Sequence, residues 1–183
     1  MPEETRMPRF TRARRQLRAF VIAMAAAVAA PMLAAAPASA QILGLVDDTG
    51  VNPQDLARLL QQWGYRAEVK TDQQGEPEIV SAVEGLTFVI FFYDCNKSAK
   101  GKCLSYQFWA GFRDLNPPVT LEKLNDWNEK QRWTMCSTDG QGRVRVKMSV
   151  NPRGTDLEQN FKNWFNWWQR SLADFKKHIN FRG

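Results

Sequence analysis

Large apolar side chains recur at spacings of three and four residues near the end of the sequence. They are Leu157, Phe161, Trp164, Phe165, Trp168, Leu172, Phe175 and Ile179. This spacing gathers them into one stripe along an α-helix. Gly154, Thr155 and Asp156 precede the stripe and are typical of a helix start. The sequence therefore predicts a long helix over residues 155–178 that buries an aromatic face.

Two shorter helices carry their own start and stop signals. Asn52 is placed to cap a helix over residues 53–63, with Pro53 at its first position and Gly64 past its end. Thr120 is placed to cap a second helix that ends near Gln131.

The segments between these helices have the alternation of β-strands. Residues 65–83 read as short strands, 104–112 alternate along one strand, and 133–138 with 144–150 form a hairpin that turns at 139–142. Residues 86–93 are an unbroken apolar run, which predicts a central strand covered on both faces. The order helix, strands, helix, hairpin, helix predicts one α+β domain with an antiparallel sheet, over residues 41–183.

The first 40 residues have the pattern of a signal peptide. Six arginines precede an uncharged run over residues 19–36, and the small residues Ala38, Ser39 and Ala40 follow. A basic region, an apolar region and this triplet predict cleavage after Ala40. We therefore expect a periplasmic or secreted protein without stable membrane insertion after cleavage, exported by the general or the twin-arginine route.

The charge of the chain does not point to nucleic acid. The formal net charge is +6, and residues 1–40 supply +4 of it through six Arg and two Glu. The remaining 19 Lys and Arg against 17 Asp and Glu leave only +2 for residues 41–183. A nearly balanced mature chain is not a polybasic nucleic-acid binder.

Several short motifs together resemble one family. They are Trp63-Gly64-Tyr65, Gly75-Glu76-Pro77-Glu78-Ile79, Phe91-Phe92-Tyr93-Asp94-Cys95, Leu124-Asn125-Asp126-Trp127-Asn128 and Asp139-Gly140. In this order and spacing, the chain resembles the YbjN domain family over residues 45–180. The resemblance implies a fold like that of the type III secretion chaperones and a sensory or regulatory role, and it implies no catalytic residues.

Three cysteines and one histidine limit the chemistry of the chain. Cys95 and Cys103 flank a hairpin loop, so we expect a disulfide between them in an oxidising compartment. A closed zinc site needs four Cys or His ligands, and only Cys136 and His178 remain, so no metal or other cofactor is expected.

Cys136 leaves two interpretations open. With a turn of two or four residues, strand parity places Cys136 on the face that carries Arg143, Arg145 and Lys147, where cations would favour its thiolate. Alternatively, a helix covers this face and Cys136 is a small buried residue. A thiol enzyme lacks an identifiable partner base, so no catalytic residue is assigned.

Two tryptophans fall outside the expected core. Trp167 lies beside the stripe of the last helix, near Arg170, and Trp109 shares its strand face with Ser105 and Gln107. Trp109, Trp167 and Arg170 are therefore the candidate binding surface, unless both rings cover a second sheet face or seal the edge of the core.

These observations favour an exported, non-enzymatic binding or regulatory module that contacts a protein partner, and a homodimer stays open. The alternatives are a small-ligand binder with a Trp-rich surface, which a deep cavity lined by Trp109 or Trp167 would favour, and a thiol enzyme that uses Cys136.

Overall fold

The computed structural model describes residues 44–96 and 101–181. These residues belong to one unit, Ala40–Gly183. The expected signal peptide and its cleavage point after Ala40 lie outside the described residues.

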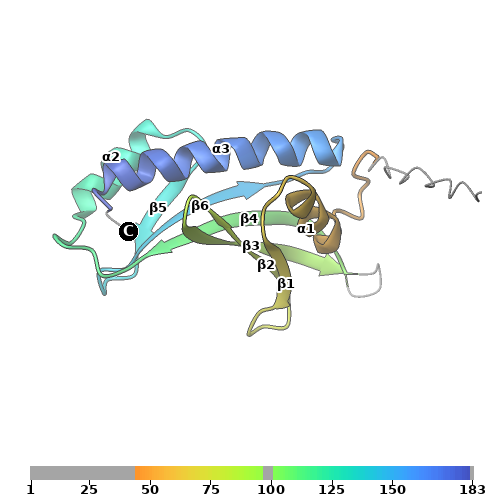
Figure 1. The fold of residues 1–183 in the computed structure, drawn as a ribbon, viewed down its shortest axis with the longest axis horizontal. Coiled ribbons are helices and arrows are strands. Elements are labelled where there is room, and N and C mark those ends of the chain that lie inside the picture. Colours follow the sequence, from red (N-terminus) through yellow and green to blue (C-terminus); the bar gives the residue numbers. More distant parts are fainter. Residues whose placement is uncertain (1–43, 97–100, 182–183) are drawn as a thin grey trace, which may run out of the picture. The chain divides into compact units, whose positions relative to one another are not determined.

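Residues 44–96 and 101–181 form three helices and six strands, in the predicted order (Figure 1). The elements are α1 (Pro53–Gln62), β1 (Ala67–Thr71), β2 (Pro77–Val83), β3 (Leu86–Asn96), β4 (Lys102–Phe112), α2 (Leu121–Lys130), β5 (Met135–Thr138), β6 (Val144–Val150) and α3 (Leu157–His178). The predicted α+β class is confirmed.

The strands form one antiparallel sheet in the order β1-β2-β3-β4-β6-β5. β3 has a strand on each side, as expected for a central strand. The last hairpin joins the sheet through β6, which pairs with β4 and places the short β5 at the edge.

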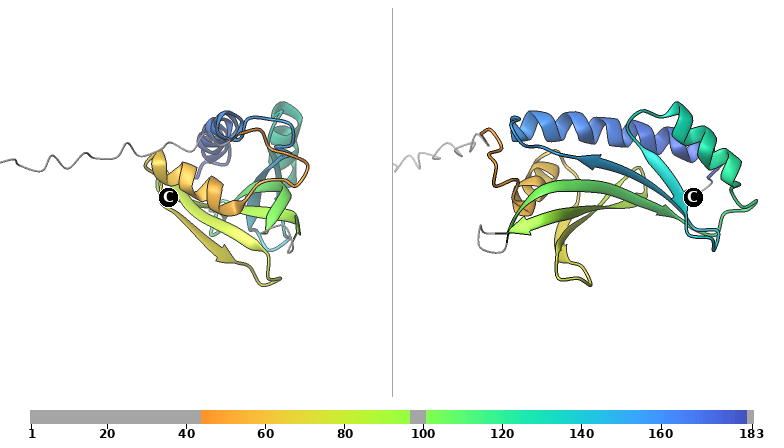
Figure 2. Two further views of the ribbon diagram at one scale, coloured as in Figure 1. Left: turned by 90° about the vertical axis from the view of Figure 1, so that its right-hand side faces the viewer. Right: turned by 180° about the vertical axis from the view of Figure 1, so that it is seen from behind.

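The helices lie on one face of the sheet (Figure 2). α3 runs over the middle of that face. The ring of Trp168, on α3, stacks on the ring of Phe108, and the two ring centroids are 5.4 Å apart. Phe161 stacks on the same Phe108 ring at 6.0 Å, and Phe165 packs against Phe88 at 6.0 Å. The predicted stripe of α3 thus packs in the core, except for Trp164, which is only half-buried.

The prediction that residues 86–93 are covered on both faces is wrong. Phe88, Ile90 and Phe92 are buried beneath the helices, whereas Val89 and Phe91 are only half-buried and Thr87 is exposed. The run is apolar on its second face because Phe91 packs against Trp109 of the neighbouring strand.

The predicted caps form. The Asn52 side chain accepts a hydrogen bond from the Gln54 amide at 2.9 Å, and Thr120 accepts one from the Lys123 amide at 3.3 Å. Asp156 caps α3 by accepting from the Gln159 amide at 2.8 Å. These bonds satisfy amides that have no partner within the helix, and thereby fix where each helix begins.

The segment before α1 is fastened to β4. The amide of Val51 donates to the Cys103 carbonyl at 2.9 Å, and the Cys103 amide donates back at 2.8 Å. Gly50, with φ +89°, precedes this bridge, and a Cβ placed on it would lie 2.1 Å from the Cys103 carbonyl oxygen. Only glycine fits there.

Amide side chains occupy both edges of the sheet. On β5, Cys136 donates its amide to Asn128 Oδ1 at 2.7 Å, and Asn128 Nδ2 donates to the Cys136 carbonyl at 3.1 Å. On β1, Gln61 Nε2 donates to the Ala67 carbonyl at 2.8 Å. Such contacts block the edge positions at which another strand could add.

Within residues 44–96 and 101–181, none of the helices is long and apolar enough to cross a membrane.

Replacing Gly50 with Ala should lower the free energy of unfolding by more than about 3 kcal/mol, because the new methyl group overlaps backbone atoms of Cys103. Gly64→Ala is the matched control, since Gly64 has φ +86° and open space around it. It should cost only the about 1 to 2 kcal/mol of left-handed backbone strain. Urea unfolding of both variants measures the difference, and equal losses would show that the close approach at Gly50 is unimportant.

Candidate binding surfaces

Trp167 lies on the outer side of α3, where 44% of its surface is exposed. Its neighbour Trp168 is fully buried. The helical periodicity separates the two adjacent indoles by about 100°, so one belongs to the core and the other faces outward. The prediction that Trp167 falls outside the buried stripe is confirmed.

Two further tryptophans gather beside Trp167. The ring of Trp133 meets Trp164 edge to face at 5.0 Å and lies 6.3 Å from Trp167. Trp133 is 38% exposed, and Trp164 is half-buried. We call these three residues the tryptophan cluster.

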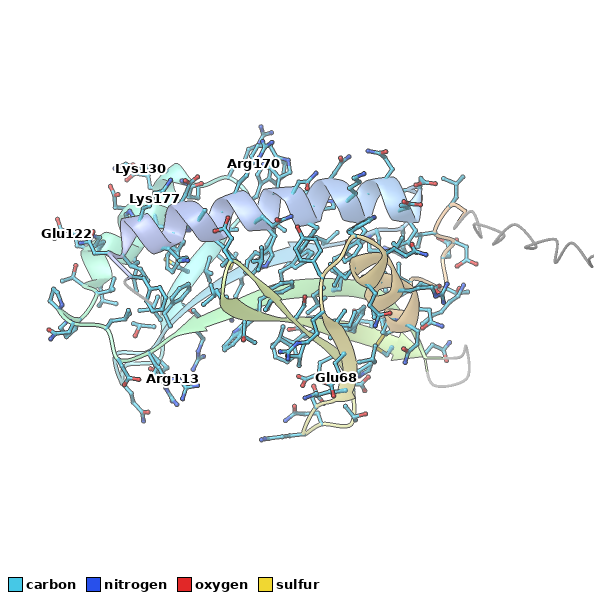
Figure 3. The ribbon with its side chains drawn as sticks, viewed as in Figure 1. Glu68, Arg113, Glu122, Lys130, Arg170 and Lys177 are labelled. Atoms are coloured by element: carbon cyan, nitrogen blue, oxygen red, sulfur yellow. A yellow bond between two sulfur atoms is a disulfide. The ribbon has the colours of Figure 1, made fainter. Side chains whose placement is uncertain are left out.

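Arginines flank the tryptophan cluster. The guanidinium of Arg170 lies 5.6 Å from the ring centre of Trp167, and that of Arg132 lies 4.8 Å from the ring centre of Trp133. Arg170 projects from α3 away from the sheet (Figure 3). The cluster therefore combines large aromatic surface with cations held over its rings.

The sequence predicted Trp167 and Arg170 but missed Trp133 and Trp164. The apolar spacing places Trp164 in the buried stripe. Trp164 also precedes Trp167 by three residues, so it lies on the helix side that carries Trp167 as well as at the edge of the stripe. Trp133 lies between α2 and β5, and its approach to α3 is a tertiary contact with no local signal.

Trp109 lies elsewhere, so the candidate surface of Trp109, Trp167 and Arg170 is not one site. β4 turns Phe108 and Ala110 toward the helices and Trp109 toward the other face of the sheet. Trp167 and Arg170 lie on the outer side of α3. The sheet and the helix separate the two positions, and a single contact patch cannot include both.

A hollow of about 500 Å³ opens beside Trp109 on the uncovered sheet face. Phe91 and Val89 line it together with Trp109, and Arg113, Arg143 and Arg145 lie at one end. Its volume falls within the range of small-molecule sites. It is an open hollow, whereas the small-ligand alternative calls for a deep cavity lined by Trp109 or Trp167.

Cys136 is buried, and its predicted placement beside cations is wrong. Cys136 lies opposite Val146, and both side chains face the helices. Arg145 and Lys147 lie opposite Ser137 and Met135, and these four side chains face the other side of the sheet. The reason is the turn, which contains five residues, 139–143, rather than an even number. An odd count reverses which residues share a face.

The surroundings of Cys136 oppose thiol chemistry. Its Sγ donates to the Leu124 carbonyl at 3.3 Å, and burial raises its pKa to about 11. The thiol therefore stays protonated at neutral pH, whereas a nucleophilic cysteine needs a lowered pKa. The alternative in which Cys136 is a small residue covered by a helix fits the structure.

The disulfide between Cys95 and Cys103 is present, and Cys136 is the free cysteine. Cys95 lies directly opposite Cys103 in the β3–β4 register. Because Cys103 also pairs with Val51, this bond ties the hairpin to the segment that leads into α1. Closing so short a loop contributes about 2 to 3 kcal/mol by the loop-entropy relation.

In the part of the chain that the structure describes, no three His, Cys, Asp or Glu side chains come together in a way that could hold a metal ion.

The arrangement defines an α+β protein whose antiparallel sheet is covered by helices on one face and carries aromatic surface on both sides of the resulting layers. The chain belongs to the YbjN family, described as a putative bacterial sensory transduction regulator, and the match covers residues 52–181. No curated protein matches the sequence.

Truncation of the two adjacent tryptophans should have very different costs. Trp168→Ala removes a fully buried ring and should lower the free energy of unfolding by about 3 to 5 kcal/mol. Trp167→Ala removes an exposed ring and should cost well under that amount. Thermal or urea unfolding of both variants tests this contrast. Equal destabilisation would mean that Trp167 belongs to the core.

Proposed function

We propose that this protein is an exported, non-enzymatic regulatory module that binds a protein partner through the tryptophan cluster. The observation that carries the proposal is the exposure of Trp133 and Trp167 beside each other, with Arg132 and Arg170 over their rings. Tryptophan and arginine are the residues that most often dominate the binding energy of protein interfaces.

The geometry of the cluster supports this use. Trp133 and Trp164 hold each other edge to face, so the aromatic surface is formed before a partner arrives. A preformed surface loses less side-chain entropy when it binds.

The edge of β5 favours a side-chain interface over strand addition. Asn128 already occupies the amide and the carbonyl of Cys136, which are groups that an incoming strand would use. A partner at this side of the molecule would therefore contact the rings of the cluster and not extend the sheet.

Two observations support a non-enzymatic role. The burial of Cys136 and its raised pKa disfavour the thiol-enzyme alternative. The family description is that of a regulator.

A photo-crosslinking amino acid at position 167 should capture a discrete partner in the cell envelope, because this position lies at the centre of the proposed interface. The matched control is position 162, since Lys162 is exposed on a different side of α3. A species of twice the mass would identify the partner as a second copy of this chain. Identical products at both positions, or none at position 167, would contradict the proposal.

Export predicts a processed N-terminus. The mature protein should begin at Gln41 and be recovered with the periplasmic fraction, because the leader pattern ends at Ala40. Intact-mass spectrometry of the protein from its native cells measures this. A chain that retains Met1 in the membrane fraction would contradict export and cleavage.

A further inference from the structure

The hollow on the uncovered sheet face has an aromatic floor that is fixed in place. A Cβ added to Gly111 would lie 2.7 Å from Cη2 of the Trp109 indole, so the ring lies directly over this glycine. Phe91 meets the same indole edge to face at 6.1 Å. The absence of a side chain at position 111 lets the indole lie along β4 and form a surface for another ring or chain.

Positive charge collects at one end of this floor. Gly111 lies opposite Arg145, and the following pair is Phe112 with Val144, so the register brings Arg113 and Arg143 to the same end of the sheet. Lys147 lies opposite Trp109 on the same face. The three arginines therefore lie at one end of the aromatic surface, and Lys147 adds a further cation beside Trp109.

In the part of the chain that the structure describes, the three arginines at this end have a single carboxylate partner. The carboxylate of Asp139 pairs with Arg143 and Arg145. Burial acts against ionisation of Asp139, but hydrogen bonds from the Gln141 amide and the Arg143 side chain outweigh it and hold its pKa below the usual value. Among the described residues, Arg113 has no acidic partner, so three arginines face one carboxylate.

We propose that this hollow binds a small organic anion whose aromatic or aliphatic body lies on Trp109 and whose carboxylate pairs with Arg113 and Arg145. A guanidinium matches a carboxylate with two parallel hydrogen bonds. The volume of about 500 Å³ suits a ligand of one or two rings. The site is separate from the tryptophan cluster, so this proposal and the proposed function can fail independently.

The test uses 2-naphthoate as the probe and neutral 2-naphthamide as its comparison. Isothermal titration should show at least about tenfold tighter binding of 2-naphthoate, because only the anion forms charge-assisted hydrogen bonds. The indole N–H signal of Trp109 should shift in NMR spectra of the labelled protein. Unaltered signals from this indole, or equal affinity for the two compounds, would overturn the proposal.

Two variants separate the contribution of the Trp109 ring to binding from the contribution of the arginines. Gly111→Ala displaces the indole and should weaken the binding of both compounds about tenfold. Arg113→Gln should weaken only 2-naphthoate, by about fivefold to tenfold, and Arg113 is exposed, so the fold should be kept. Arg153→Gln, at the other end of β6, is the matched control and should change neither affinity.

A loss of 2-naphthoate binding in Arg153→Gln equal to that in Arg113→Gln would show general attraction to positive charge and overturn the proposal. A competition experiment with an acidic peptide that contains one Trp completes the test. If this peptide displaces 2-naphthoate and binds more than tenfold tighter, the hollow is a peptide site, and the assignment to a small organic anion is wrong.

Discussion

The stacking of α3 on the middle of the sheet is the interaction on which the rest of the structure depends. Trp168 and Phe161 both stack on the Phe108 ring, and Phe165 packs on Phe88 of the neighbouring strand. These contacts join the end of the chain to its central strands. A helix with so wide an aromatic stripe can bury it only against a broad apolar surface, and β2, β3, β4 and β6 together provide one.

This arrangement uses one face of the sheet and leaves the other without a helix among the described residues (Figure 2). Residues on the uncovered face cannot all be polar in a strand as apolar as β3. Val89 and Phe91 are therefore shielded by a neighbour in the sheet, Trp109, whose ring lies over Gly111. The same packing that hides part of this apolar surface creates the hollow with arginines at its end.

The tryptophan cluster has a different origin. One side of α3 is buried in the core, and the opposite side is exposed. There the ring of Trp167 contacts Trp133, which belongs to the segment between α2 and β5. Asn128 holds β5 in position by binding both backbone groups of Cys136. Cys136 is thus conspicuous in the sequence but has a structural role, whereas the exposed rings beside it form the surface that favours binding.

Local patterns in the sequence determined the helices, their caps, most strands and the pairing of Cys95 with Cys103, because spacing, capping groups and chain proximity act over a few residues. They also separated Trp167 from Trp168. Tertiary structure alone decided that Trp109 and Trp167 lie apart, that Trp133 joins Trp167, and that Cys136 is buried. These outcomes depend on how many residues a turn contains and on which sheet face a helix covers. An added residue in the turn 139–143 reverses the side-chain directions of a whole strand, and no pattern within that strand reveals it.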